Sequence, residues 1–196
     1  MSTQGEKLDP RVKRTRGLLQ RALTDLLSEK RFHTITVQDI TERADVNRTT
    51  FYAHFEDKYA LLNYRVREEF RKRVDQAVPE LPGFTQENLR RLTVITGHYL
   101  SEFLGRCRRS AQDGDQAVLV RQVQVQCYES ILEWFTRSWG RAAPYGLTPE
   151  VVAMVTSWAI FGSALQWVDQ GGELTPEQLA DQVLSLLKSG LQLYLP

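Results

Sequence analysis

The sequence predicts an all-α fold of about nine helices, arranged in two parts. Apolar residues recur at three- and four-residue steps along nearly every segment, which is the spacing of one face of a helix. Hydrophobic residues make up 42% of the 196 residues, which is enough for a core, and no segment has a confident strand pattern. The sequence PELPG at 79–83 separates an N-terminal part from a larger C-terminal part.

The first helix is predicted from Pro10 to about Lys30. Asp9 is a suitable N-cap, and proline is favoured in the first turn because its missing N–H costs nothing there. Apolar side chains then recur at helical spacing as far as Leu27. One face of this helix should therefore pack against the rest of its domain.

A short second helix is predicted after RFHTIT (residues 31–36), which breaks the periodic pattern. Thr36 is its expected N-cap, and Asp39 three residues later completes a variant of the capping box. The helix should end near Arg43. The free backbone amides at its start suit an anion such as a phosphate.

The third helix is poorly supported by propensity, because VNRTTFYAHF (residues 46–55) contains two adjacent threonines and three aromatic residues. Asp45 precedes it at a turn where a positive φ is often needed, and Asp tolerates that better than most residues. Asn47 is a good N-cap. On a helix Phe51 and Phe55 share one face, so they should anchor it and leave the opposite face free.

A long fourth helix is expected to begin after the cap Asp57 and to end near Val78. Four more long helices should follow in the C-terminal part. SAQDGD (110–115) has the composition of a loop between two of them. QAVLVRQVQV (116–125) alternates like a strand, but the length of its segment and the lack of Gly and Pro favour a helix.

Positive charge is concentrated near the N-terminus. Residues 1–75 contain 16 Lys and Arg against 12 Asp and Glu, whereas residues 76–196 contain 9 against 12. A basic front suggests a polyanionic partner, although an ordinary solvated helix face explains this distribution about equally well. The basic residues near the start are Lys7, Arg11, Lys13, Arg14, Arg16 and Arg21.

The second and third helices, with the first packed behind them, form a helix–turn–helix. This arrangement places a short helix in the major groove of DNA. Arginine pairs with guanine and a threonine methyl contacts thymine, whereas hydroxyl groups and lysine suit phosphate oxygens. The predicted contacts with double-stranded DNA are Thr36, Arg48, Thr49, Thr50, Tyr52, His54 and Lys58.

The sequence ITVQDITERADVNRTTFYAHFEDKYALL (residues 35–62) resembles the DNA-binding signature of the TetR/AcrR family of bacterial transcriptional regulators. The resemblance extends over about residues 10–65. Asp45 stands where this family usually has a glycine, and Asn47 where it usually has a serine. Neither difference removes a predicted DNA contact.

The resemblance implies a domain organisation and a function. Residues 1–56 would bind DNA, helix 57–78 would be a connector, and residues 79–196 would bind an effector and dimerise. A homodimer would bind a near-palindromic operator, with each subunit on one half-site. The implied protein is a repressor released by a small-molecule effector. Activation of transcription, or coactivation through protein contacts, are the alternatives.

The resemblance implies that the last two helices pair across the dimer axis, and the sequence fits this. The helix after Thr148-Pro149 is apolar on most sides, which is more than one buried face requires. Packing within the subunit is the alternative for about half of these apolar side chains. The expected interface residues are Trp158, Phe161, Gly162, Leu165, Val183, Leu187 and Leu191.

The resemblance also implies an effector pocket in the C-terminal part, lined by aromatic and polar residues of facing helices. Such a pocket would suit a flat or apolar compound. Ordinary core packing is the alternative for aromatic residues at helical spacing. The candidates are His98, Tyr99, Phe103, Gln124, Tyr128, Trp134 and Trp158.

The sequence lacks the groups that an enzyme needs. It shows no Ser-His-acid order, no glycine-rich phosphate loop and no metal-ligand spacing, so we expect no catalytic residue, metal or cofactor. Cys107 and Cys127 form no disulfide framework, and plain thiols are expected. Polar residues interrupt every apolar run and the N-terminus does not resemble a signal peptide, so a cytoplasmic protein without membrane contact is expected.

Overall fold

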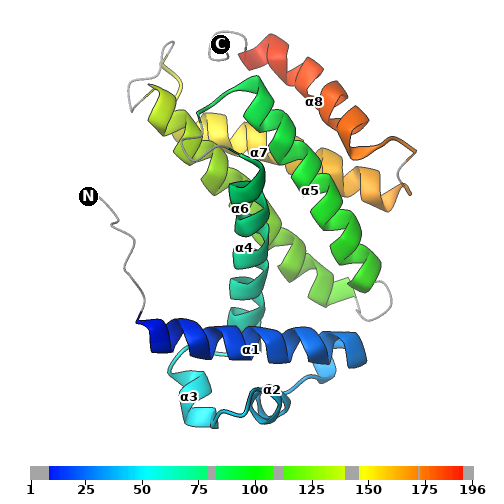
Figure 1. The fold of residues 1–196 in the computed structure, drawn as a ribbon. Helices are drawn as coiled ribbons and strands as arrows, with labels where there is room; N and C mark the ends of the chain where they lie inside the picture. The colour runs from blue at the N-terminus through cyan, green and yellow to red at the C-terminus, as the bar shows by residue number, and fades with distance from the viewer. Residues whose placement is uncertain (1–8, 79–82, 108–112, 140–145, 172, 192–196) are drawn as a thin grey trace. The chain divides into compact units, whose positions relative to one another are not determined.

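The computed structural model describes residues 9–78, 83–107, 113–139, 146–171 and 173–191 (Figure 1). The described residues are helical, with no strand among them, which confirms the predicted all-α class. In order, the elements are α1 (Pro10–Glu29), the 3-10 helix η1 (Phe32–Thr34), α2 (Val37–Ala44), α3 (Arg48–Tyr52), α4 (Lys58–Ala77), α5 (Gln86–Cys107), α6 (Asp113–Trp139), α7 (Pro149–Asp169) and α8 (Pro176–Leu191).

These helices belong to two units, which we call the N-terminal unit and the C-terminal unit. The N-terminal unit contains α1, α2, α3 and the beginning of α4 as far as Arg65. The C-terminal unit contains α4 from Val66 onward, α5, most of α6, α7 and α8. The boundary between the units therefore falls within one continuous helix.

Hydrogen bonds to nearby side chains cap the N-termini of α1 and α2, as the sequence predicts. The Asp9 carboxylate accepts a hydrogen bond from the backbone N of Arg11 at 2.9 Å. At the start of α2 the Thr36 hydroxyl accepts from the backbone N of Asp39 at 3.1 Å, and the Asp39 carboxylate accepts from the backbone N of Thr36 at 2.7 Å. This reciprocal pair is the predicted capping box.

The turn between α2 and α3 depends on one residue in the left-handed region. Asp45 has φ of 54°, and among the described residues it is the only one other than glycine with a positive φ. The Asn47 side chain then accepts a hydrogen bond from the backbone N of Thr50 at 2.6 Å and caps α3. Both roles agree with the sequence prediction.

The core of the N-terminal unit is built from apolar faces of all four helices. Leu19, Leu23 and Ile40 are inaccessible to solvent, and Phe51 of α3 likewise has no exposed surface. Phe55 is also buried but lies beyond the end of α3, so the prediction that it shares a helix with Phe51 is wrong. Its backbone N still bonds to the carbonyl of Phe51, which keeps the two rings on one side.

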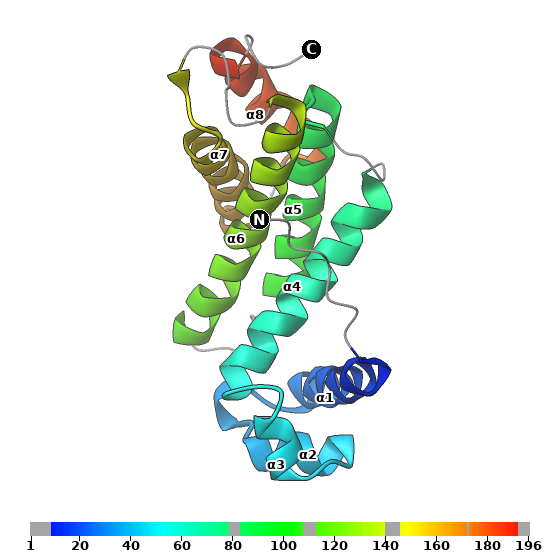
Figure 2. The same cartoon turned by 90° about the vertical axis from the view of Figure 1, so that its left-hand side faces the viewer.

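In the C-terminal unit α5 packs against both α7 and α8 (Figures 1 and 2). Tyr99 of α5 lies in the core, with its ring stacked on Phe103 and edge-on to Phe70. The segment 116–125 is helical, as predicted. However, α6 begins at Asp113, inside the stretch that was expected to be a loop.

Helix α7 is long and apolar enough, by length and composition, to cross a membrane. The interrupted apolar runs of the sequence did not predict this. One side of α7 is buried in the C-terminal unit, where it carries small or β-branched residues such as Ala153, Thr156 and Ala164. Its opposite side is apolar and exposed.

Candidate nucleic-acid interface

Helix α3 separates an anchoring side from an accessible side. Phe51 is fully buried, whereas the neighbouring Tyr52 is 51% exposed. Arg48 and Thr49 are exposed as well, and Thr50 is half-buried. The predicted base-contacting side chains therefore lie on the surface of the N-terminal unit, on a helix that the buried Phe51 anchors.

His54 follows α3 and is half-buried. Burial, and then the positive charge of Arg16, lower the pKa of the His54 imidazole below its usual value. The ring is therefore neutral at pH 7, where it can donate one hydrogen bond and accept another. It contributes no positive charge toward a phosphate.

The Thr36 hydroxyl is used within the capping box. It accepts from the backbone N of Asp39 and donates to the Asp39 carboxylate at 2.8 Å. The hydrogen bond from the Thr36 backbone, followed by that from the Lys30 ammonium, lowers the pKa of Asp39 to about 2. Thr36 therefore positions α2, and its single hydroxyl proton is already committed.

Lys58 lies at the first position of α4, and its ammonium points back into the N-terminal unit. Its Nζ donates to the backbone carbonyls of Phe32, His33 and Ile35 at 3.1, 3.0 and 2.8 Å. It also lies 4.8 Å from the centre of the Phe32 ring. An ammonium has three N–H donors, so these carbonyls account for all of them. The Lys58 ammonium therefore holds η1 against the start of α4, which we call the Lys58 clamp, and has no N–H left for the predicted phosphate contact.

Two arginines that the sequence did not single out as contacts hold the helices together. The Arg16 guanidinium lies 5.8 Å from the Phe55 ring centre and 5.1 Å from that of Tyr64, and thus joins α1 to the segment after α3 and to α4. Arg43 of α2 forms a two-pronged ion pair with Glu29 of α1, with both bonds at 2.8 Å. Arg16 precedes Leu19 by three residues on the apolar face of α1, and this spacing is the signal in the sequence for its role.

Residues 19–64, which span α1 to α4 of this interface, match the family model described as bacterial regulatory proteins of the tetR family. This segment is a TetR-family DNA-binding domain. The match confirms the resemblance inferred from residues 35–62.

Two curated relatives match a part of the chain. The uncharacterized HTH-type transcriptional regulator YxbF of Bacillus subtilis is 38% identical over 71 residues, which cover 36% of this chain and 19% of that protein. The HTH-type dhaKLM operon transcriptional activator DhaS of Lactococcus lactis is 32% identical over 56 residues, 29% of this chain and 30% of that protein. The matched stretch thus spans less than a third of either relative.

A solved structure matches nearly the whole chain. The TetR-family transcriptional regulator from Syntrophomonas wolfei superimposes with a TM-score of 0.57 and 22% identity, over 90% of this chain and 94% of that one. At this identity the likeness shows a common fold. The C-terminal unit therefore has the fold that accompanies TetR-family domains in that protein.

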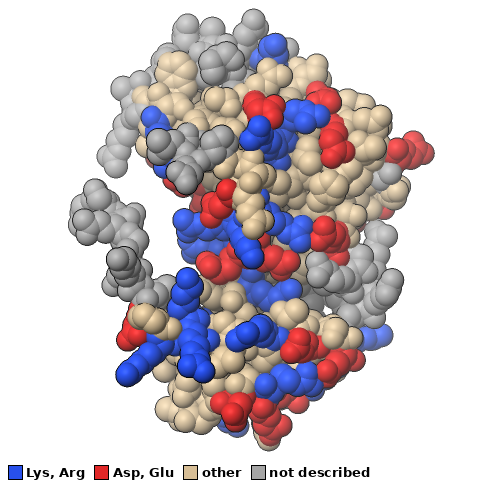
Figure 3. All heavy atoms as spheres, viewed as in Figure 1, with Lys and Arg blue, Asp and Glu red and all other residues tan. Residues whose placement is uncertain are grey.

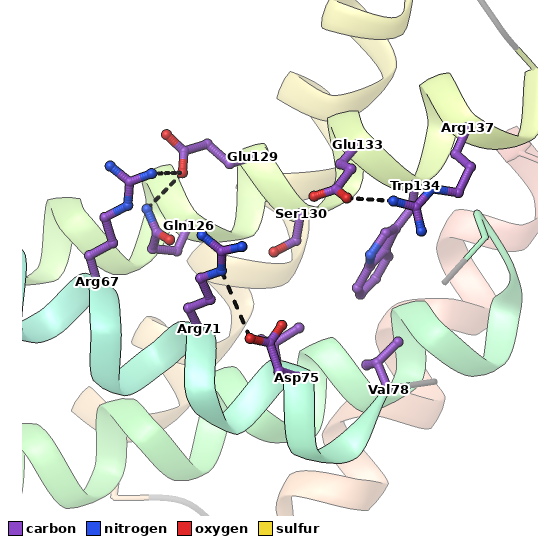
Figure 4. Close-up of a pocket in the computed structure, with 11 residues that line it drawn as sticks. Arg67, Arg71, Asp75, Val78, Gln126, Glu129, Ser130, Glu133, Trp134 and Arg137 are labelled. Atoms are coloured by element: carbon purple, nitrogen blue, oxygen red, sulfur yellow. Dashed lines mark hydrogen bonds and ion pairs between the residues drawn. The ribbon is translucent and has the colours of Figure 1, made fainter. Parts of the chain in front are cut away.

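A groove of about 440 Å³ lies between α4 and α6 of the C-terminal unit (Figure 4). An ion pair of 3.8 Å joins Arg67 on the α4 wall to Glu129 on the α6 wall, and Gln126 donates to the same carboxylate at 2.9 Å. Deeper in, the Trp134 ring points into the groove toward α4. The lining residues are Arg67, Arg71, Val74, Asp75, Val78, Gln126, Glu129, Ser130, Glu133, Trp134 and Arg137.

The seven predicted effector residues are not brought together in this groove, and only Trp134 lines it. Tyr99 and Phe103 belong to the core, and Gln124 donates to Ser157 at 3.3 Å. His98 is exposed and lies 3.6 Å from Glu177 of α8. Tyr128 is half-buried and Trp158 is exposed. Helical spacing could not show which of these aromatic residues face a cavity.

The predicted dimer residues divide between the core and the surface. Phe161 and Val183 are buried within the C-terminal unit, so intramolecular packing accounts for them. Gly162, Leu165 and Leu187 are half-buried, and the side chain of Leu191 lies outside the described residues. Trp158 is 57% exposed and belongs to a strip on α7 that we call the apolar face of α7; it consists of Val151, Met154, Val155 and Trp158.

Cys127 is buried between α5 and α6, with its Sγ 3.3 Å from the Thr96 hydroxyl. Burial raises the pKa of the Cys127 thiol to about 12. This thiol is therefore protonated and unreactive at neutral pH. The side chain of Cys107 lies outside the described residues.

Proposed function

We propose that the chain is a DNA-binding transcriptional regulator, and that it acts in the cytoplasm as a homodimeric repressor released by a small-molecule effector. One observation carries the DNA-binding part. Helix α3 is anchored by the buried Phe51 and presents Arg48, Thr49 and Tyr52 on its free side, within a TetR-family domain. That geometry suits insertion into the major groove, with arginine pairing to guanine and the tyrosine hydroxyl bonding to a phosphate.

The apolar face of α7 supports the dimer. Its side chains are between 43% and 57% exposed, and Leu186 on α8 is 81% exposed. Exposed apolar side chains that follow one face of a helix mark an interaction surface. A two-fold axis through this face pairs each strip with its own copy, and two linked α3 helices then contact two half-sites.

The groove between α4 and α6 supports effector control. Helix α4 forms one wall of the groove through Arg67 and Arg71, and the same helix carries the Lys58 clamp at its first position. A compound that breaks the Arg67–Glu129 ion pair would shift α4, and α4 continues into the DNA-binding unit. The repressor is then released because the compound favours a state that binds DNA less well.

Selection of bound sequences from a random DNA pool tests the DNA-binding claim. The purified protein is incubated with the pool at about 0.1–0.15 M salt, where non-specific binding is weak. The expected product is a near-palindromic motif with two half-sites. A folded dimer that enriches no sequence contradicts the proposal.

The groove is tested separately, with the variant Ser130→Trp and the selected DNA as a probe. Ser130 is half-buried in the groove lining, so an indole there should fill the space and abolish release by any compound that releases the parent from DNA. Thr136→Trp at an exposed position of α6 is the matched control. Equal release of the parent and of Ser130→Trp contradicts the assignment of the groove.

Activation is the second candidate, because one matching relative, DhaS, is named a transcriptional activator. The two modes differ in where the operator lies relative to the promoter. In vitro transcription from a promoter that carries the selected motif at its natural position separates them. Reduced transcript with added protein indicates repression, and increased transcript indicates activation.

A further inference from the structure

We propose that the start of α1 forms a second DNA-contacting surface, which binds the phosphate backbone of duplex DNA beyond the half-site that α3 contacts. The surface consists of Arg11, Lys13 and Arg14, which we call the basic turn. The inference rests on the proposed function, since it assumes that α3 lies in the major groove.

The three cations of the basic turn are available to a partner. All three side chains are exposed. No hydrogen bond or ion pair joins their side chains to another side chain in the part of the chain that the structure describes. The neighbouring Asp9 carboxylate accepts a hydrogen bond from the backbone N of Arg11 and supplies one negative charge beside these three positive ones. Figure 3 shows the resulting accumulation of blue atoms over the first half of α1.

Folding of α1 does not account for this charge. The positive end of a helix dipole lies at its N-terminus, so cations there are unfavourable and carboxylates are favourable. The first turn of α1 contains no acidic residue. Asp9 and Pro10 already supply the cap and the first-turn residue that begin the helix. The basic turn therefore opposes helix stability, whereas it suits a polyanion.

The position of the basic turn relative to α3 selects duplex DNA as that polyanion. Arg16, two residues after Arg14, packs against the Phe55 ring just beyond the end of α3. Figure 1 shows α3 beneath the first half of α1. At 1.5 Å per residue, Arg11 lies only about 8 Å along the helix axis from Arg16. Duplex DNA carries one phosphate charge per ~1.7 Å of axis, so a duplex that continues past α3 offers phosphates to this turn.

The experiment compares two probes and two variants. One probe ends at the selected motif, and the other extends it by about one helical turn, roughly 10 base pairs, on each side. The test variant is Arg11→Gln/Arg14→Gln. The control Lys72→Gln/Arg121→Gln removes the same charge from exposed positions of the C-terminal unit. Affinity is measured over a series of salt concentrations.

On the long probe, the test variant should lower the salt slope by about one for each residue and subunit, because each lost phosphate contact releases about one counterion fewer. On the short probe it should bind like the control. The thermal midpoint of the test variant should equal or exceed that of the parent, since the substitutions remove positive charges from the positive end of the α1 dipole. Loss of affinity cannot then be attributed to unfolding.

Two results overturn the inference alone. In one, the test variant binds the long probe as the parent does. In the other, the test variant loses the same affinity for both probes, which indicates a general electrostatic attraction to DNA instead of a contact with the flanking phosphates. Failure of the parent to bind either probe overturns the proposed function and the inference together.

Discussion

The Lys58 ammonium donates to the backbone carbonyl of Ile35 at 2.8 Å, across 23 residues of sequence. With its bonds to Phe32 and His33, it fixes the connection between α1 and α2 to the first turn of α4. Its role is therefore to position the DNA-binding helices.

We expect Lys58→Met to destabilise the protein by about 1–3 kcal/mol, because three carbonyls lose a charged donor. Its DNA affinity should fall with an unchanged salt slope, since no phosphate contact is removed. Lys72→Met, on the exposed side of the same helix, is the control for charge. Urea unfolding and DNA titration at several salt concentrations check both statements. A salt slope that drops by about one in Lys58→Met alone would show a phosphate contact.

Tyr52→Phe isolates a single hydroxyl group on α3. The ring is edge-on to Phe51 at 5.4 Å, and phenylalanine keeps that contact. We expect DNA affinity to fall by about 0.5–1.5 kcal/mol on every probe sequence, because a phosphate bond is lost. The free energy of unfolding should not change. Unaltered affinity, measured by anisotropy titration, would remove Tyr52 from the interface.

The apolar face of α7 provides a test of the dimer. Trp158→Asp places a charge within the proposed interface and should cost about 3 kcal/mol or more of association free energy, because the carboxylate is buried there without a partner. Thr136→Asp, at an exposed position of α6, is the matched control. Sedimentation should show a monomer for Trp158→Asp and a dimer for the control. Two dimers would place the interface elsewhere.

The capping box should be visible in the pH dependence of stability. The pKa of Asp39 is about 2 in the folded state and near 3.8 when the chain is unfolded. The carboxylate therefore stabilises the fold above about pH 4, and this contribution is lost as pH falls toward 2. Asp39→Asn should have a flatter stability profile between pH 4 and 2 than the parent. Parallel profiles in chemical denaturation would contradict a stabilising role of this carboxylate.

Local features of the N-terminal unit could be predicted from sequence because they depend on residues close together in the chain. The capping box of Thr36 and Asp39 and the cap of Asn47 lie within three residues of the amides that they bind. The positive φ of Asp45 follows equally from its place in a tight turn. The buried side of α3 followed from Phe51.

Features that depend on distant contacts could not be predicted. Lys58 appears as a free cation at a helix start until η1 is placed beside it. The groove lining depends on which sides of α4 and α6 face each other, and only the packing of the two helices shows this. Tyr99 was as good a candidate for a pocket as Trp134, yet only the packing of α5 shows that it belongs to the core.

Recognition of DNA bases by α3 depends above all on Arg48, the arginine exposed on that helix. Motifs are selected in parallel with the parent and with Arg48→Ala, from the same pool and at the same salt concentration. We expect a palindromic motif for the parent, and loss of preference at one position of each half-site in the variant, worth about 1–3 kcal/mol. Identical motifs from both proteins would show that Arg48 contacts no base, and no motif from either would contradict DNA recognition by this chain.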